Sequence, residues 1–219
     1  MRKNMQWMKC TNDRAILFSM TTATLPSKRA STRDLILEHA YELARNDGLE
    51  GLSIGTLAID VGMSKSGLFA HFGSREDLQL AVLDTGTQRF MAKVLLPALK
   101  RPRGLPRLRS IVANWLEWGR EYQSGCVLLS ATSEYDGRNG ALHDKVVQQQ
   151  AGWRGELQKT IAQAAAEGHL RADTDTAQLA FEIYALMLGV HHDAGLFGFD
   201  EAGQRAAQAF ERLWRSWQA

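Results

Sequence analysis

The sequence predicts an all-α protein with two helical domains. Apolar residues recur at helical spacing through most of the 219 residues, for example at Phe210, Leu213, Trp214 and Trp217, which repeat at i, i+3, i+4 and i+7. No alternation of apolar and polar residues longer than four positions indicates a strand, and no internal repeat or low-complexity tract occurs. A chain of this length is sufficient for one large core or two modest ones.

Residues 53–78 predict two short helices joined by a tight turn. Ser53 is an N-cap residue for the first helix, and Gly62 ends it in the left-handed conformation that glycine adopts most easily. Ser64 caps the second helix. The apolar faces consist of Ile54, Leu57, Ala58 and Val61 in the first helix and of Leu68, Phe69 and Phe72 in the second. This succession is the layout of a helix-turn-helix, whose second helix enters the major groove of DNA.

The first turn of the second helix carries small, polar and cationic residues. Lys65, Ser66 and Gly67 open this helix, where side chains reach base edges and phosphates and where the free amides attract a phosphate. A third helix is expected directly afterwards, with Ser74 as its N-cap and Asp77 three residues later in a variant of the capping box.

The run SIGTLAIDVGMSKSGLFAHFGSREDL, residues 53–78, resembles the TetR family of transcriptional repressors, and the similarity extends over residues 31–80. The resemblance implies a three-helix DNA-binding domain and a helix of residues 75–96 that joins it to a ligand domain. One departure is Phe69, where the family usually has a tyrosine whose hydroxyl meets a phosphate. We expect the DNA-binding residues to be Ser53, Thr56, Ser64, Lys65, Ser66, Gly67, Phe69, His71 and Arg75.

The domain organisation follows from these patterns. Residues 1–30 are expected to form a disordered extension, residues 31–75 the DNA-binding domain, and residues 76–219 the ligand-binding and dimerisation domain. Met20 is a second candidate for the natural start. The alternative to a disordered tail is an arm in which Lys28 and Arg29 reach DNA. The first helix, residues 32–46, places His39 in its apolar stripe, which predicts a packed core histidine. Further helices are expected at residues 108–123, 127–135, 141–167, 174–194 and 201–218, after a linker at residues 100–109 that holds two prolines.

The composition limits the cellular setting and the kind of DNA contact. The formal net charge is +2, and residues 27–75 contain six Lys or Arg and six Asp or Glu, so a basic footprint must be local and non-specific affinity low. No apolar run approaches the roughly 20 residues of a membrane span. Two cysteines make no disulfide framework and suit a reducing cytoplasm, and we predict no export and no membrane partner.

The predicted C-terminal domain is rich in aromatic residues. The resemblance places several of them on helices that enclose an effector pocket, with Glu134 and His192 as polar groups. Aromatic walls with few charges suit a small, apolar and aromatic effector. Filling of the core is the equally weighted alternative for each ring. The residues expected at the ligand site are Trp115, Trp118, Tyr122, Cys126, Glu134, Tyr135, Trp153 and His192.

Cys126 and the run His191-His192-Asp193 are two further candidates for a chemical site. Cys126 follows Gly125 at the start of a helix, where a thiol pKa can be lowered, so redox sensing is an alternative to a small buried residue. His191, His192 and Asp193 are adjacent and point about 100° apart on a helix, so we predict no metal site there, and expect His192 to face inward and His191 outward. No catalytic pattern and no cofactor motif is found, and we predict that the chain is not an enzyme.

Together, these patterns predict a homodimeric, ligand-responsive repressor that binds a near-palindromic operator. The alternatives are an all-α ligand-binding or enzymatic protein with a vestigial DNA-binding domain, a redox sensor acting through Cys126, and an architectural DNA-binding protein without effector. A heavy apolar face on the terminal helix needs a cover, which predicts a dimer interface on the last two helices; the alternative is that this face packs inward only. Its expected residues are Leu179, Ile183, Leu186, Val190, Phe210, Leu213, Trp214 and Trp217.

Overall fold

The computed structural model describes residues 28–122 and 125–219, which form an all-α fold as predicted. The predicted disordered extension falls largely on residues 1–27, outside the described residues. Within the described ranges, the sole extended pairing is an isolated bridge between Leu170 and Gln218. No helix there is long and apolar enough to cross a membrane. The helices are α1 (Lys28–Gly51), α2 (Ile54–Asp60), α3 (Lys65–Phe72), α4 (Arg75–Phe90), α5 (Leu96–Leu99), α6 (Leu105–Glu121), α7 (Val127–Tyr135), α8 (Ala141–Ala166), α9 (Thr176–Phe197) and α10 (Phe199–Trp217), with a π-helical turn, η1 (Met91–Leu95).

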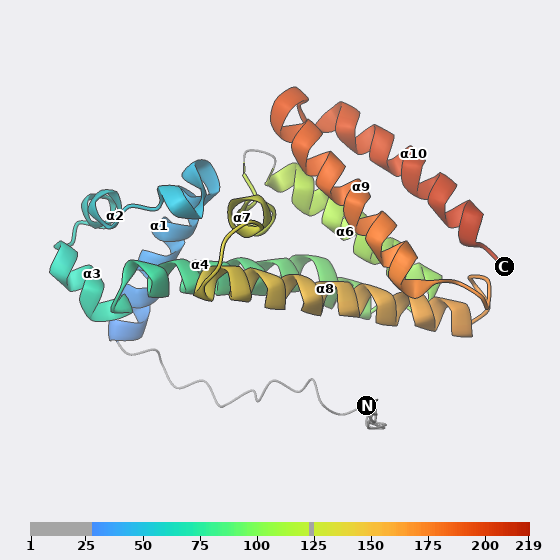
Figure 1. Cartoon of the computed structure of the whole chain (residues 1–219), viewed down its shortest axis with the longest axis horizontal. Coiled ribbons are helices and arrows are strands. Elements are labelled where there is room, and N and C mark those ends of the chain that lie inside the picture. The colour runs from blue at the N-terminus through green and yellow to red at the C-terminus, as the bar shows by residue number, and fades with distance from the viewer. Residues whose placement is uncertain (1–27, 123–124) are drawn as a thin grey trace, which may run out of the picture.

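The arrangement is elongated, with two groups of helices joined by α4. In Figure 1, α1, α2 and α3 form one end of the molecule, and α4 runs from them alongside α8. At the other end, α9 packs on α8 and α6, and α10 covers the outer side of α9. Helix α7 lies between the two groups and packs against α1 as well as α8.

The predicted caps of the helix-turn-helix are confirmed. The Ser53 hydroxyl accepts a hydrogen bond from the amide of Thr56 at 3.4 Å, and the Ser64 hydroxyl accepts one from Gly67 at 3.1 Å. Gly62 has a φ of 65°, the left-handed conformation expected after the last apolar residue. Because these signals lie within a few residues of each helix end, the sequence was sufficient to place both helices.

The first helix differs from its prediction at His39. His39 does not lie in the core: its Nδ1 is 2.7 Å from the Asp60 carboxylate of α2, and its side chain is 37% exposed. The apolar stripe turns away from this row, since Leu35 is also exposed while Ile36, Ala40 and Tyr41 are buried. Helical spacing placed His39 correctly on α1, but the position of α2 decides its surroundings.

The helix that joins the two groups continues beyond its predicted end. It was expected to stop at Pro97, but α4 passes through the π turn η1 into α5, where Pro97 occupies the first turn. Proline is tolerated there because the amides of a first helical turn have no partner within the helix. The side-chain amide of Asn114 in α6 donates to the Val94 carbonyl at 2.9 Å and so satisfies a backbone group of the π turn.

The C-terminal helices correct two further predictions. The cap of α9 is Asp175, not residue 173 or 174, and its carboxylate accepts from the amides of Ala177 and Gln178. His191 is the more buried member of the histidine pair and His192 is exposed, the reverse of the prediction. Burial lowers the pKa of His191.

The terminal stripe is covered within its own chain and does not need a second subunit for its burial, contrary to expectation. Phe210 and Trp214 are both 2% exposed because α10 packs this face against α9 and α6 of its own chain. Leu179, Ile183 and Val190 are likewise buried within the monomer. Of the predicted interface residues, the partly buried ones are Leu186, Leu213 and Trp217.

Candidate DNA-binding surface and effector cavity

The outer face of α2 and α3 carries the predicted DNA-contacting side chains. Thr56, Lys65 and Ser66 are exposed, and Phe69 is 43% exposed in the middle of α3. The Lys65 side chain passes close to Gly55: a Cβ added to Gly55 would lie 3.5 Å from the Cε of Lys65. No ion pair involves Lys65 within the described residues. The ammonium group is therefore available to a phosphate or a guanine.

Arg75 and His71 are placed differently from the exposed group. The Arg75 guanidinium donates from Nε to the Leu52 carbonyl at 3.0 Å and also bonds the Glu50 carbonyl, with the Glu50 carboxylate 3.6 Å away. These bonds tie the start of α4 to the end of α1. His71 is half-buried, and its Nδ1 has no hydrogen-bond partner within the described part of the chain. A role for either in DNA contact remains a prediction.

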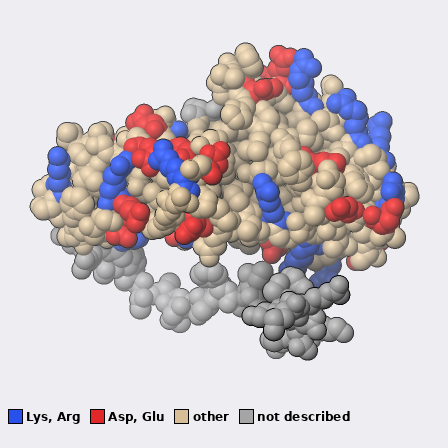
Figure 2. Space-filling model, in the orientation of Figure 1, with Lys and Arg blue, Asp and Glu red and all other residues tan. Residues whose placement is uncertain are grey.

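Charge on this end of the molecule is paired rather than concentrated. Arg45 contacts Glu42 at 2.7 Å, and Arg89 of α4 bonds Glu38 of α1. Figure 2 shows basic and acidic side chains interspersed on the face in view, without one extended basic area. The balance of charges found in the sequence therefore also holds locally, and α3 supplies its own small cationic site at Lys65.

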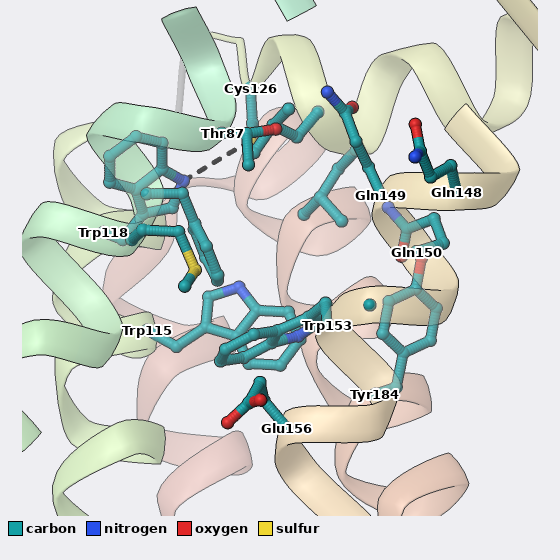
Figure 3. Close-up of a pocket in the computed structure, with 15 residues that line it drawn as sticks. Thr87, Trp115, Trp118, Cys126, Gln148, Gln149, Gln150, Trp153, Glu156 and Tyr184 are labelled. Atoms are coloured by element: carbon teal, nitrogen blue, oxygen red, sulfur yellow. Dashed lines mark hydrogen bonds between the residues drawn. The ribbon is translucent and has the colours of Figure 1, made fainter. Parts of the chain in front are cut away.

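A second candidate site is a cavity of about 340 Å³ between α4, α6, α7, α8 and α9. Four large rings stand around it: the Phe90 ring meets those of Trp153, Trp118 and Trp115 edge-on at 4.8, 5.5 and 5.6 Å. Figure 3 shows the tryptophans with Tyr184 about the central space. The volume is at the lower end of the range of small-molecule pockets. The lining residues are Thr87, Phe90, Met91, Trp115, Trp118, Cys126, Leu128, Leu129, Gln148, Gln149, Gln150, Gly152, Trp153, Glu156 and Tyr184.

Half of the predicted ligand residues line this cavity. They are Trp115, Trp118, Cys126 and Trp153. The other four do not line it. Tyr122 stacks behind Trp118 at 3.9 Å, with Arg45 4.6 Å from its ring centroid. Glu134 and Tyr135 contact α1 instead, and His192 is an exposed residue of α9.

The sequence reasoning missed the polar part of the cavity. Gln148, Gln149, Gln150 and Glu156 come from α8, and Thr87 comes from α4. A signal was present in the three consecutive glutamines that precede Trp153 in a helix of otherwise mixed polarity. Their direction relative to α4 and α6 depends on tertiary packing, which local spacing does not give.

Cys126 is a buried wall residue with an unreactive environment. Its side chain is 3% exposed, and its sulfur accepts a hydrogen bond from the indole of Trp118 at 3.4 Å. Burial raises the pKa of the Cys126 thiol, although the bond from Trp118 opposes the shift. A thiol kept protonated and covered is a poor nucleophile, which argues against the redox alternative.

An open groove runs between α9 and α10 on the surface away from the core. It is lined mainly by small and apolar residues, and Phe181 at its edge is 56% exposed. Leu186 and Leu213 contribute their partly exposed sides. Leu196 and Phe197 at the end of α9 are also largely exposed.

The fold and these two sites define a helix-turn-helix transcription regulator with a helical C-terminal domain. Two family models match the chain: "Bacterial regulatory proteins, tetR family" over residues 36–82, and "Tetracyclin repressor-like, C-terminal domain" over residues 104–210. The chain belongs to the TetR family of transcriptional regulators.

Individual relatives agree with this assignment. The chain is 24% identical over 186 residues to the HTH-type transcriptional repressor ComR of Escherichia coli, covering 83% of this chain and 88% of ComR. A TetR family regulator from Cytophaga hutchinsonii superposes with a TM-score of 0.77 at 21% identity, covering 90% of this chain and 99% of that one. The structure of AibR in complex with isovaleryl coenzyme A and operator DNA has a TM-score of 0.66 at 21% identity, covering 81% and 97%. These structural similarities concern the fold.

Proposed function

We propose that the protein is a homodimeric repressor that binds a near-palindromic operator and is released from it by a small aromatic effector. The observation that carries the proposal is the position of the cavity on the helix that leaves the DNA-binding domain. Phe90 and Thr87 of α4 line the cavity, while the start of the same helix packs behind α3. A ligand that favours one position of α4 then also favours one position of the reading helix.

Contacts between α1 and α7 support the same coupling. Leu128 and Leu129 of α7 line the cavity, and the other end of α7 hydrogen bonds to the end of α1 through Glu134 and Tyr135. AibR, a protein of the same fold, has been captured with both a ligand and operator DNA. A coupling free energy of about 1–3 kcal/mol between the two sites is typical of such regulators.

We place the dimer interface on the groove between α9 and α10. Two antiparallel helices from each subunit would meet there as a four-helix bundle about a two-fold axis. The exposed Phe181 and the small residues Ala185, Gly189 and Ala209 allow close approach of a second copy. A two-fold dimer presents two reading helices to successive major grooves, which is why the operator is expected to be a near-palindrome.

The test is selection of bound fragments from the genomic DNA of the source organism with the purified full chain. We expect enrichment of fragments that share a near-palindromic sequence with half-sites about one helical turn apart. If no fragment is enriched above the background bound by the Lys65→Ala variant, the alternative of an all-α ligand-binding protein with a vestigial DNA-binding domain is favoured.

A further inference from the structure

The cavity contains three buried polar atoms that have no hydrogen-bond partner within the described residues. They are the Trp153 indole N–H, the Gln150 side-chain carbonyl and the Thr87 hydroxyl. Trp153 as a whole is 9% exposed. A buried polar atom without a partner costs about 1–3 kcal/mol, and three such atoms belong to residues that line one cavity, where a shift of these side chains would let a ligand supply partners.

Charge in the cavity has one sign. Glu156 is the sole charged residue among those that line it, and no ion pair or side-chain hydrogen bond of its carboxylate is found within the described chain. In Figure 3, the Glu156 carboxylate lies beneath the indoles of Trp115 and Trp153, while Gln148, Gln149 and Gln150 lie at the other end of the view. The guanidinium of Arg154 lies 4.4 Å from the ring centroid of Tyr184, one of the lining residues. Arg154 itself does not line the cavity.

From these observations we infer that the effector is a cationic aromatic amine whose ammonium group is held by Glu156. A carboxylate beside electron-rich ring faces favours an organic cation through both ion pairing and cation–π attraction. The aromatic body of the ligand would pack against the cluster formed by the rings of Phe90, Trp115 and Trp153, which contact one another edge-on at 4.8–5.6 Å. A hydroxyl or amide at its far end can both donate and accept, and would bond Gln150 and Thr87 once their side chains turn toward it.

The same arrangement excludes a large class of ligands. Burying a carboxylate or phosphate beside Glu156, with no lining Lys or Arg, would be strongly unfavourable. A phosphorylated or acyl-coenzyme A ligand of the kind bound by AibR therefore does not suit this cavity, despite the shared fold. This inference rests on the proposed function, because it names the class of effector for the same cavity.

The test uses three probes of matched shape: 1-naphthylmethylamine, 1-naphthylmethanol and 1-naphthoate, titrated into the purified full chain by calorimetry at pH 7. We expect the amine to bind at least tenfold more tightly than the alcohol, and the carboxylate to bind most weakly. In Glu156→Gln, the amine should lose about tenfold in affinity while the alcohol changes less than threefold. Glu167→Gln, an exposed carboxylate just after the same helix, is the matched control and should leave all three affinities unchanged.

The order of the three probes on the unmodified chain tests the inference even if Glu156→Gln fails to fold. Equal or tighter binding of 1-naphthoate would overturn it, and so would unchanged amine affinity in a folded Glu156→Gln. If the chain binds operator DNA but none of the probes at about 1 mM, the ligand class is wrong and the DNA-binding role stands. If the amine binds in the expected order but no operator is found, the proposed function fails and the ligand class stands.

Discussion

The carboxylate of Glu134 accepts a hydrogen bond from the backbone N–H of Leu49 at 3.1 Å, across 85 positions of the chain. Its second oxygen accepts from the N–H of Glu50 at 2.9 Å. Both amides follow Gly48, where α1 breaks with a φ of 76° and where a Cβ would lie 2.6 Å from the Glu134 carboxylate. Helix α7 therefore caps the end of α1, and the ligand domain holds the DNA-binding domain by its first helix.

Removal of this cap should loosen the contact between the domains. We expect Glu134→Ala to lower the free energy of unfolding by about 1–2 kcal/mol, because two amides lose a charged acceptor. It should also weaken the effect of a bound effector on operator affinity. Urea unfolding followed by circular dichroism measures the first quantity. Glu167→Ala, on the exposed end of α8, is the control, and an equal change in both variants would contradict the role of the cap.

Stability should depend on pH through Glu50. The hydroxyl of Tyr135, which donates to Glu50 at 2.7 Å, and then the charges of Arg138 and Arg75 hold the pKa of Glu50 below its ordinary value. A lowered pKa in the folded state stabilises the fold at pH values above about 4.3, where the unfolded carboxylate ionises, and this contribution is lost as the pH falls through the folded pKa.

The check is a comparison of the unmodified chain with Glu50→Gln in urea between pH 7 and about 3.5. We expect the difference between their unfolding midpoints to be largest at neutral pH and to shrink at the acidic end. Glu167→Gln should show no such trend. A difference that grows as the pH falls would mean that ionised Glu50 does not stabilise the fold.

Operator binding should depend on Lys65 through its charge. Lys65→Ala is expected to weaken binding and to reduce the slope of log affinity against log salt concentration by about 1, if the ammonium group contacts a phosphate. The fold should be unaffected, since the side chain is exposed. Lys159→Ala, an exposed lysine of α8, should leave both affinity and slope unchanged. An unaltered salt slope in Lys65→Ala would show that α3 does not carry this phosphate contact.

The dimer should separate when charge is placed in the groove of α9 and α10. Phe181→Glu is expected to give a folded monomer in sedimentation velocity, because the apolar ring would be replaced by a carboxylate that loses its hydration between the subunits. Val147→Glu is the matched control, since Val147 is also an exposed apolar residue and lies on α8. If Phe181→Glu sediments as a dimer of unchanged affinity, the interface lies elsewhere.

The thiol of Cys126 should be unreactive in the folded protein. In a chain carrying Cys10→Ala, we expect Cys126 to react with an aromatic disulfide reagent only at the rate of unfolding, because it is covered and its raised pKa keeps it protonated. Addition of urea should restore the rate of a free thiol. Rapid reaction of the native chain would instead support the alternative that Cys126 is a redox sensor.

Predictions that depended on residues close together in the sequence were accurate, and those that depended on contacts between helices were not. Ser53, Ser64 and Gly62 act within one turn, so the helix-turn-helix could be located from its residues alone. The prediction that His39 is a core residue was wrong because its partner, Asp60, belongs to another helix.

The candidate cavity shows the same difference between local spacing and packing between helices. Trp115 and Trp118 both line the cavity, as their spacing predicted, because residues three positions apart on one helix share a face. Glu156 and Gln150 were missed because their helix faces the cavity only after α8 packs against α4 and α6. Tyr135 was misassigned for a similar reason, since the direction of α7 points its end toward α1.

The π turn at Met91–Leu95 divides one continuous helical rod into two segments that are out of phase. Because i→i+5 bonding accommodates an extra residue, the faces before and after the turn are offset by roughly 100° relative to an unbroken α-helix. Helix α4, which packs behind α3 and carries Thr87 and Phe90 of the cavity, and the short helix α5, which packs against α6, therefore follow different helical wheels. Deletion of one residue within the turn would restore a single phase and rotate one domain about the rod axis. In the proposed dimer, the orientation of α4 relative to α6, and with it the separation of the two reading helices, is thus tied to the winding of five residues.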